Sequence, residues 1–243
     1  REGFRNVAEA YNCYSRADAL AFVSEDVKNA FFQYFKPTKR SEVLYNVFDS
    51  DSIKKLSKEA PGVFMDPLKL NWCGVGKLIP LKGWDRMLKI QRKLIDSGYP
   101  AHFYLIGDGP QRKELERLAD RMGISDSVTF TGYLQNPYAS LSRCMLYVCA
   151  SEREGFSTAA VEALLSGTPV CTVDVGGMKE ILGSNNEYGV VVPNDEKVLS
   201  DAVLRFFKNE DYRSIYRKAA IERGGNFSKE QTVMAVESFL LSL

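Results

Sequence analysis

The stretch of sequence that decides the fold runs from residue 145 to residue 177 and reads MLYVCASEREGFSTAAVEALLSGTPVCTVDVGG. Two short apolar runs flank a segment with helical spacing, which predicts a strand over 145–149, a helix over 157–166 and a second strand over 169–173. A strand–helix–strand unit of this size forms a crossover, so the two strands are expected to be parallel. Both strands are almost wholly apolar, as burial on two faces requires.

The same alternation continues on both sides of this unit. Further short apolar runs predict strands, and the segments between them have the apolar spacing of helices. The expected strands lie at 71–75, 102–106, 128–130 and 189–192, and the expected helices at 84–95, 110–122, 136–143, 178–182, 196–208, 212–223 and 229–241. The sequence therefore predicts an α/β fold, with a doubly wound, Rossmann-like parallel sheet over about residues 69–220.

The first 48 residues repeat this pattern on a smaller scale. A helix is expected to end near Arg16, followed by a strand at 19–23, a helix at 26–35 and a strand at 43–45. We interpret residues 1–49 as the remnant of an N-terminal Rossmann-like domain, a partial second α/β domain whose first strands lie outside this chain. The Lys- and Pro-containing residues 50–68 are expected to be the linker.

The composition describes an ordinary soluble globular protein. Hydrophobic residues make up 45% and charged residues 26% of the 243 residues, which excludes a disordered or collagen-like chain. Because 32 Lys and Arg residues nearly balance 31 Asp and Glu residues, nothing indicates a nucleic-acid partner. No apolar stretch is long enough to span a bilayer, and five cysteines without a CxxC motif favour free thiols in a reducing cytoplasm.

Glycines and charged residues gather after the predicted strands. In an open parallel sheet, ligands bind beyond the carboxyl ends of the strands. The residues found there are Gly76, Lys77, Lys82, Gly107, Gly109, Tyr133, Leu134, Glu154, Gly155, Phe156, Ser157, Thr158, Gly176 and Gly177. This edge is suited to a small molecule that carries phosphate and hydroxyl groups.

The segment after residue 149 is the most informative of these loops. Gly155 permits close approach of the backbone to a ligand, and the N–H groups of residues 156–158 are unpaired at the helix start, where they favour an anion. Glu154 in the loop and Glu162 in the helix can accept hydrogen bonds from the vicinal hydroxyls of a ribose or hexose. The alternative, two ordinary surface charges, stays open at this point.

Lys77 and Lys82 offer two positive charges just beyond the first strand of the sheet. A pyrophosphate would satisfy both through charge-assisted hydrogen bonds of about 1.5–3 kcal/mol each; the alternative is two solvated loop lysines. The sequence has no dinucleotide fingerprint and no Walker motif. No group of residues has metal-ligand spacing, and the single histidine, His102, is expected to be structural, so we expect neither a metal nor another cofactor.

Together these motifs resemble the retaining glycosyltransferases of family 4, which have the GT-B fold. The resemblance covers about residues 69–195, and its strength lies in the order and spacing of motifs that are weak one by one. The matching segments are VGKLIPLKGWD at 75–85, LIGDGP at 105–110, EGFSTAAVEA at 154–163, GTPV at 167–170 and GGMKE at 176–180. Residues 17–27 and 45–49 are similar to the end of the family's first domain.

The resemblance implies a role for each matching residue. Lys77 and Lys82 would hold the donor diphosphate, with Gly76, Gly107 and Gly109 in the surrounding loops. Many members have Arg where this chain has Lys77, which lacks the planar fork of a guanidinium. The segment 176–178 also lacks the Pro often found there.

The sugar and the nucleoside are assigned in the same way. Glu154 would face the donor sugar near the reacting centre, and Glu162 would accept hydrogen bonds from the nucleotide ribose. The backbone N–H groups of Gly155, Phe156, Ser157 and Thr158 would meet the sugar and the phosphates, and Tyr133 and Leu134 would lie near the base. Glu154, Lys82 and Lys77 are the expected catalytic residues.

The implied activity is sugar transfer from a nucleotide diphosphate-sugar, such as a UDP- or GDP-sugar, with retention of configuration and without a metal. The implied acceptor is a glycan or lipid-linked glycan of polysaccharide biosynthesis. Residues 1–49 would belong to the acceptor-side domain, and residues 221–243 would form a C-terminal helix that packs back toward them. The chain is then a fragment that supplies the donor-binding half and transfers poorly on its own. We expect it in the cytoplasm, at the inner face of the membrane through the rest of the first domain.

Two other functions remain open from the sequence. One is a nucleotide-sugar epimerase of the same architecture, which would release a free epimer without an acceptor. The other is a non-catalytic nucleotide-binding subunit that needs a partner chain.

Overall fold

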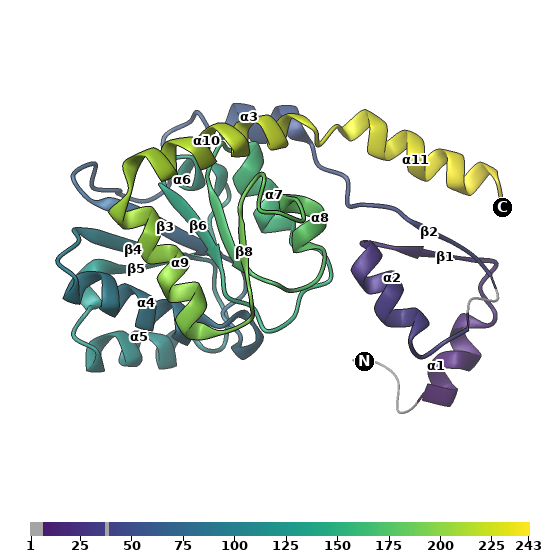
Figure 1. Ribbon diagram of the computed structural model, residues 1–243, viewed down its shortest axis with the longest axis horizontal. Coiled ribbons are helices and arrows are strands. Elements are labelled where there is room, and N and C mark those ends of the chain that lie inside the picture. Colours follow the sequence, from purple (N-terminus) through teal and green to yellow (C-terminus); the bar gives the residue numbers. More distant parts are fainter. Residues whose placement is uncertain (1–6, 37–38) are drawn as a thin grey trace.

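The computed structural model of the chain describes residues 7–36 and 39–243. Its main body is a six-stranded sheet in the order β5-β4-β3-β6-β7-β8, in which all neighbouring strands are parallel (Figure 1). The strands are β3 (Leu70–Val75), β4 (Ala101–Ile106), β5 (Val128–Gly132), β6 (Leu146–Cys149), β7 (Val170–Val173) and β8 (Val190–Val192). The predicted parallel α/β sheet is confirmed, with each strand within about two residues of its expected bounds.

Helices cover both faces of this sheet. One face carries α4 (Trp84–Asp96), α5 (Arg112–Arg121) and α9 (Glu196–Lys208), which pack side by side. The crossovers on the other face contain α6 (Tyr138–Leu141), α7 (Thr158–Leu165) and α8 (Met178–Leu182), and α10 (Glu210–Gly225) packs on α7 (Figure 1). Two short 3₁₀ helices, η1 (Pro80–Lys82) and η2 (Ser125–Ser127), precede α4 and β5.

The strand order contains a switch point. The chain moves outward from β3 to β4 and β5, and then returns through α6 to β6 on the other side of β3. The connections on the two sides of β3 therefore diverge and leave a crevice between the carboxyl ends of β3 and β6. This is the position at which a doubly wound sheet binds its ligand.

The core beneath this crevice is aromatic. Trp72 of β3 is fully buried and stacks on Phe103 of β4 with ring centroids 4.0 Å apart. Its indole Nε1 donates to Gln91 Oε1 at 2.7 Å, so the one polar atom of the ring is satisfied inside the core. Burial of each such side chain contributes about 2–3 kcal/mol, which makes β3 and β4 a rigid base for the loops that follow them.

The N-terminal part forms a small parallel pair of strands with two helices. Strand β1 (Ala19–Phe22) pairs with β2 (Arg40–Val43), next to α1 (Val7–Tyr14) and α2 (Glu25–Phe32). The strand predicted at 43–45 instead starts at Arg40. Its first three residues are polar and only partly covered, so the apolar pattern does not mark them.

The segment 50–68, predicted to be a plain connection, contains helix α3 (Ser50–Leu56). The side chain of Asp49 caps it by accepting from Ser52 N at 3.3 Å, and the buried Ile53 anchors it. Helix α10 continues to Gly225, past residue 220, where we expected the C-terminal domain to end. Ala220 and Gly224 are buried, and Gly224 lies against Leu164 of α7, so the end of α10 belongs to this domain.

The last helix, α11 (Lys229–Leu241), lies beside the N-terminal part (Figure 1). Lys229 Nζ lies 3.7 Å from Asp49 Oδ2, and the Arg40 guanidinium lies 5.4 Å from the ring centroid of Phe239. Arg40 also donates to the carbonyl of Ser242 at 3.2 Å. Among the described residues, no helix combines the length and the apolar character needed to cross a membrane.

Candidate functional site

A cavity of about 210 Å³ opens at the switch point. Its walls come from the loop after β3, the carboxyl end of β6 and the start of α7. The residues that line it are Val75, Gly76, Lys77, Lys82, Trp84, Met87, Tyr147, Val148, Cys149, Ala150, Ser151, Glu154, Phe156, Ser157, Thr158, Ala159 and Glu162. Eight of the predicted site residues are therefore brought together: Gly76, Lys77, Lys82, Glu154, Phe156, Ser157, Thr158 and Glu162.

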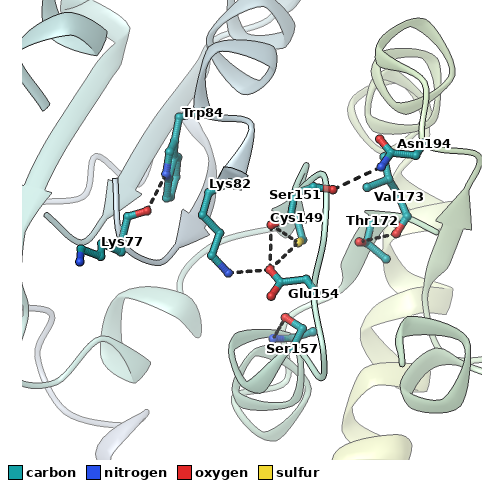
Figure 2. Close-up of polar contacts among 11 residues, drawn as sticks. Lys77, Lys82, Trp84, Cys149, Ser151, Glu154, Ser157, Thr172, Val173 and Asn194 are labelled. Carbon is teal, nitrogen blue, oxygen red and sulfur yellow. Dashed lines mark hydrogen bonds and ion pairs between the residues drawn. The ribbon is translucent and has the colours of Figure 1, made fainter. Parts of the chain in front are cut away.

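An ion pair between Lys82 and Glu154 crosses this cavity. Lys82 Nζ lies 2.6 Å from Glu154 Oε1, and the same oxygen accepts from Ser151 Oγ at 2.7 Å (Figure 2). The two side chains are only 27% and 13% exposed, so the pair is partly shielded from water. A carboxylate and an ammonium held this way present one acceptor group and one cation to anything that enters.

Gly83 explains how Lys82 reaches this place. Its backbone is left-handed, with φ at 64°, and a Cβ there would lie 2.3 Å from the carbonyl oxygen of Ala150. Only glycine permits this close approach of η1 to the end of β6. The preceding residue, Lys82, is thereby carried across from the β3 loop to the β6 loop.

The start of α7 forms the third wall. Ser157 is its N-cap, with the side chain accepting from Ala160 N at 3.3 Å. The N–H groups of Ser157, Thr158 and Ala159 donate no hydrogen bond within residues 7–36 and 39–243. Free N–H groups and the positive end of the helix dipole make this tip attractive to an anion.

Glu162 lies one turn further into α7, on the cavity wall. Burial raises the pKa of its carboxyl above the ordinary value, while a hydrogen bond from Tyr138 acts in the opposite direction. The pKa of Tyr138 is itself raised, first by burial and then by the charge of Glu162. Such a shielded carboxylate strengthens any hydrogen bond it accepts, because little water competes for it.

Lys77 lines the cavity but is placed differently from Lys82. Figure 2 shows its side chain pointing away from the Lys82–Glu154 pair. Its carbonyl oxygen accepts from Trp84 Nε1 at 3.0 Å, which fixes the backbone at this point. The ammonium is exposed and forms no ion pair within the described part of the chain, so it is available to a ligand at the mouth of the cavity.

Five predicted site residues do not line this cavity: Gly107, Gly109, Tyr133, Leu134 and Gly155. The first two have a packing role that the sequence did not separate from binding. A Cβ at Gly107 would lie 2.1 Å from Gly76 O, and one at Gly109 would lie 2.6 Å from Leu78 N. These glycines let the loop after β4 pack on the loop after β3.

Tyr133 and Gly155 lie outside the cavity for other reasons. Tyr133 is 85% exposed, beyond the end of β5, with Leu134 beside it. Gly155 follows Glu154 directly, but its carbonyl turns to the N-terminal part, where it accepts from Ser24 Oγ at 2.9 Å.

Two wall residues were missed by sequence reasoning. Ser151 donates to Glu154, and its place three residues earlier in the same loop was the available signal. Cys149 was considered only as one of five free thiols, yet its Sγ lies 3.4 Å from Ser151 Oγ and 3.8 Å from Glu154 Oε1. Burial, followed by the charge of Glu154, raises the pKa of this thiol, so it is a neutral wall group. Within the described residues, no cluster of three or more His, Cys, Asp or Glu side chains is placed to hold a metal ion.

The overall structure is that of a known class. It matches the Anabaena protein HepE, solved in complex with UDP, with a TM-score of 0.83 and 22% identity over 100% of this chain and 69% of that chain. It also matches sucrose-phosphate synthase of Thermosynechococcus elongatus, with a TM-score of 0.82 and 19% identity over 97% of this chain and 61% of that chain. The chain therefore has the fold of the GT-B glycosyltransferases.

The sequence identifies the family. Residues 71–223 match the family model described as Glycosyl transferases group 1, and the chain belongs to this family. This confirms the resemblance to glycosyltransferase family 4 found in the motifs.

Two curated relatives show the range of similarity. The 2-deoxystreptamine glucosyltransferase of Streptomyces kanamyceticus is 32% identical over 133 residues, 54% of this chain and 34% of the relative. The N-acetylgalactosamine-N,N'-diacetylbacillosaminyl-diphospho-undecaprenol 4-alpha-N-acetylgalactosaminyltransferase of Campylobacter jejuni is 26% identical over 231 residues, 94% of this chain and 61% of the relative. The chain thus spans between about a third and three fifths of the length of these relatives.

Proposed function

We propose that this chain supplies the donor-binding half of a retaining hexosyltransferase. The donor would be a nucleotide diphosphate-sugar, and the acceptor a glycan or lipid-linked glycan. The observation that carries this proposal is the convergence of Lys82, Glu154 and the free tip of α7 on one cavity at the switch point. A cation and unpaired N–H groups suit a diphosphate, and an adjoining carboxylate suits the hydroxyls of a sugar.

The chemistry follows from where charge develops. When the bond between the anomeric carbon and the diphosphate oxygen breaks, negative charge grows on the departing diphosphate. Lys82 and the N–H groups of Ser157 and Thr158 would stabilise that charge without a metal ion. Lys77, which lines the cavity and forms no ion pair with any residue that the structure describes, would add a second ammonium group.

Donor binding in this site is an exchange of partners. In the structure, Lys82 already has a counter-ion in Glu154 at 2.6 Å. An entering diphosphate would compete for Lys82, and Glu154 would then be free to accept hydrogen bonds from sugar hydroxyls. Ser151 would keep the released carboxylate in place through its 2.7 Å hydrogen bond. Glu162, on the wall formed by α7, would accept from the ribose.

The relatives favour particular ligands for testing. HepE was solved with UDP and, in another crystal, with UDP-glucose, so uridine donors are the first to examine. The name of the C. jejuni relative describes a diphospho-undecaprenol-linked acceptor. A lipid-linked acceptor would place the complete enzyme at the cytoplasmic face of a membrane, held there through the rest of the first domain.

Isothermal titration calorimetry of the chain against UDP, GDP, ADP and their glucose conjugates tests this proposal. Saturable binding of one diphosphate that is weakened about tenfold or more in Lys82→Ala and kept in Lys113→Ala supports it. Lys113 is an exposed lysine on α5 that lies outside the cavity. No binding of any of these compounds to the folded chain would overturn it. Release of a free epimer from a bound donor would favour the epimerase instead.

A further inference from the structure

Glu180 belongs to the GG-x-x-E element, and the donor chemistry above gives it no role. It is the third residue of α8 and does not line the donor cavity. Its carboxylate turns to the N-terminal part of the chain. Glu180 Oε2 accepts from Glu25 N at 3.0 Å and from the Tyr45 hydroxyl at 3.0 Å, and Oε1 accepts from Asp26 N at 3.1 Å.

These contacts use both oxygens of the carboxylate. Two of the donors are the first two N–H groups of α2, where a negative charge is favoured by the helix dipole. Glu180 has no ion pair in the described portion of the chain, so α2 and Tyr45 are the groups that satisfy it. Burial, then the hydrogen bond to Glu180, raises the pKa of Tyr45 to about 12, with Glu25 acting in the same direction and Arg223 against it.

The segment that Glu180 holds touches the donor loop directly. Ser24, fully buried and the N-cap of α2, donates its hydroxyl to Gly155 O at 2.9 Å. The Tyr45 ring lies 5.5 Å from the ring of Phe156, which lines the donor cavity. Ser24 and Tyr45 thus contact the two residues directly after Glu154, and Glu180 accepts hydrogen bonds from Tyr45 and from the helix that Ser24 caps.

The Gly176–Gly177 turn lets these parts meet. Gly177 N donates to the same Gly155 carbonyl at 3.3 Å. A Cβ at Gly176 would lie 2.6 Å from Glu154 O, and one at Gly177 would lie 3.0 Å from Ser24 Cβ. The two glycines allow close packing of three segments, and Glu180, three residues on, adds the charged contact between them.

We propose that Glu180 is a positioning residue for donor recognition. It acts through the start of α2 and through Tyr45, which it fixes against the loop of Glu154, Gly155 and Phe156. This inference rests on the proposed function, since the loop it positions is the one that would contact the donor sugar. Lys82 comes from η1, and the start of α7 is capped by its own Ser157, so we expect these diphosphate contacts to depend less on Glu180 than the sugar contacts of Glu154 do.

Amide hydrogen exchange of the ligand-free chain separates this role from simple capping of α2. In Glu180→Ala, we expect exchange to rise about tenfold or more at Glu25 and Asp26 and also at Gly177, whose N–H donates to the Gly155 carbonyl. Glu180→Gln keeps the shape and one acceptor oxygen and should give an intermediate result. Glu114→Gln, on the exposed surface of α5, is the matched control. Faster exchange at Glu25 and Asp26 with no change at Gly177 would overturn the inference.

Calorimetry provides a second readout that a merely structural role would not produce. The dissociation constant of UDP-glucose should rise about tenfold in Glu180→Ala, while that of UDP changes less than about twofold, since one recognition contact is worth about that factor. An equal loss of affinity for both ligands, or no loss for either, would contradict a positioning role of Glu180. Tyr45→Phe removes one contact and leaves α2 capped, so it tests the same idea if Glu180→Ala does not fold. If the unaltered chain binds no nucleotide at all, the proposed function fails, and the exchange experiment still decides whether Glu180 orders the loop.

Discussion

Replacement of Lys82 by Ala tests the assignment of the diphosphate site. Of the two lysines that line the cavity, Lys82 forms the ion pair across it, with Nζ 2.6 Å from Glu154 Oε1 and the side chain 27% exposed. Contacts of this ammonium to a diphosphate would contribute about 1.5–3 kcal/mol as charge-assisted hydrogen bonds. At 1.36 kcal/mol per factor of ten, the dissociation constant of UDP should rise by about 10- to 150-fold.

The same substitution also affects the chain without ligand. It removes the counter-ion of a carboxylate that is only 13% exposed and leaves Glu154 with Ser151 as its hydrogen-bond donor. Because the pair is partly open to water, we expect a loss of only about 1 kcal/mol of stability. The variant should therefore stay folded at 25 °C, and a thermal melt verifies this before binding is measured.

Calorimetric titration with UDP is the assay, with Lys113→Ala as the control for loss of a positive charge. In a complete enzyme, Lys82→Ala should lower transfer by about 100-fold or more, comparable to the loss of one transition-state donor. If a folded Lys82→Ala chain binds UDP within twofold of the unaltered chain, Lys82 does not hold the diphosphate.

Three further predictions follow from the same geometry. Glu154→Gln removes the carboxylate that competes for Lys82, so UDP should bind as tightly as to the unaltered chain or up to about fivefold more tightly. The additional affinity that the sugar gives UDP-glucose over UDP should be lost, and calorimetry with UDP and UDP-glucose measures both effects. Burial raises the pKa of Glu162 above its usual 4.5, so between 4.5 and the raised value the folded state keeps a proton that the unfolded chain releases. The stability that this proton contributes is present at low pH and is lost as the pH rises through the raised pKa. The free energy of unfolding, measured by denaturant titration at several pH values, should fall with rising pH more steeply for the unaltered chain than for Glu162→Gln. The same pH dependence in both chains would contradict this. Gly107→Ala puts a Cβ 2.1 Å from Gly76 O at a φ of 139° and should lower the free energy of unfolding by about 3 kcal/mol. Gly98→Ala, with φ at 80° and open space around it, should lower it by about 1 kcal/mol. Equal melting temperatures for the two variants would contradict the close packing of the loops after β3 and β4.

Much of the fold could be predicted because double-sided burial leaves a strong pattern. The strands of the main sheet are nearly all apolar, and glycines, prolines and caps such as Asp195 mark their connections. The N-terminal part was less predictable. Strand β2 begins with Arg40, Ser41 and Glu42, and its pairing with β1 is a long-range event that no local pattern reports. Helix α3 carries a single buried residue, Ile53, too little for an amphipathic signal.

One part of the candidate site could be predicted, namely which loops meet at the switch point. Topology alone brings Lys82, Glu154 and Glu162 to one crevice, since each follows a strand that ends there. Sequence could not show that Lys82 and Glu154 pair with each other, that Lys77 points elsewhere, or that Gly107 serves packing. Nor could it show that the carboxylate of Glu180 caps a helix 154 residues away in the chain.

A crystal structure of this chain with UDP bound would show whether the cavity at the switch point is the donor site. The proposed donor site requires the diphosphate to lie between Lys82 and the N-terminal tip of α7, the ribose to lie against Glu162, and the Lys82–Glu154 separation to be well beyond the present 2.6 Å. UDP bound at another surface, or bound here with the Lys82–Glu154 pair still closed, would contradict it.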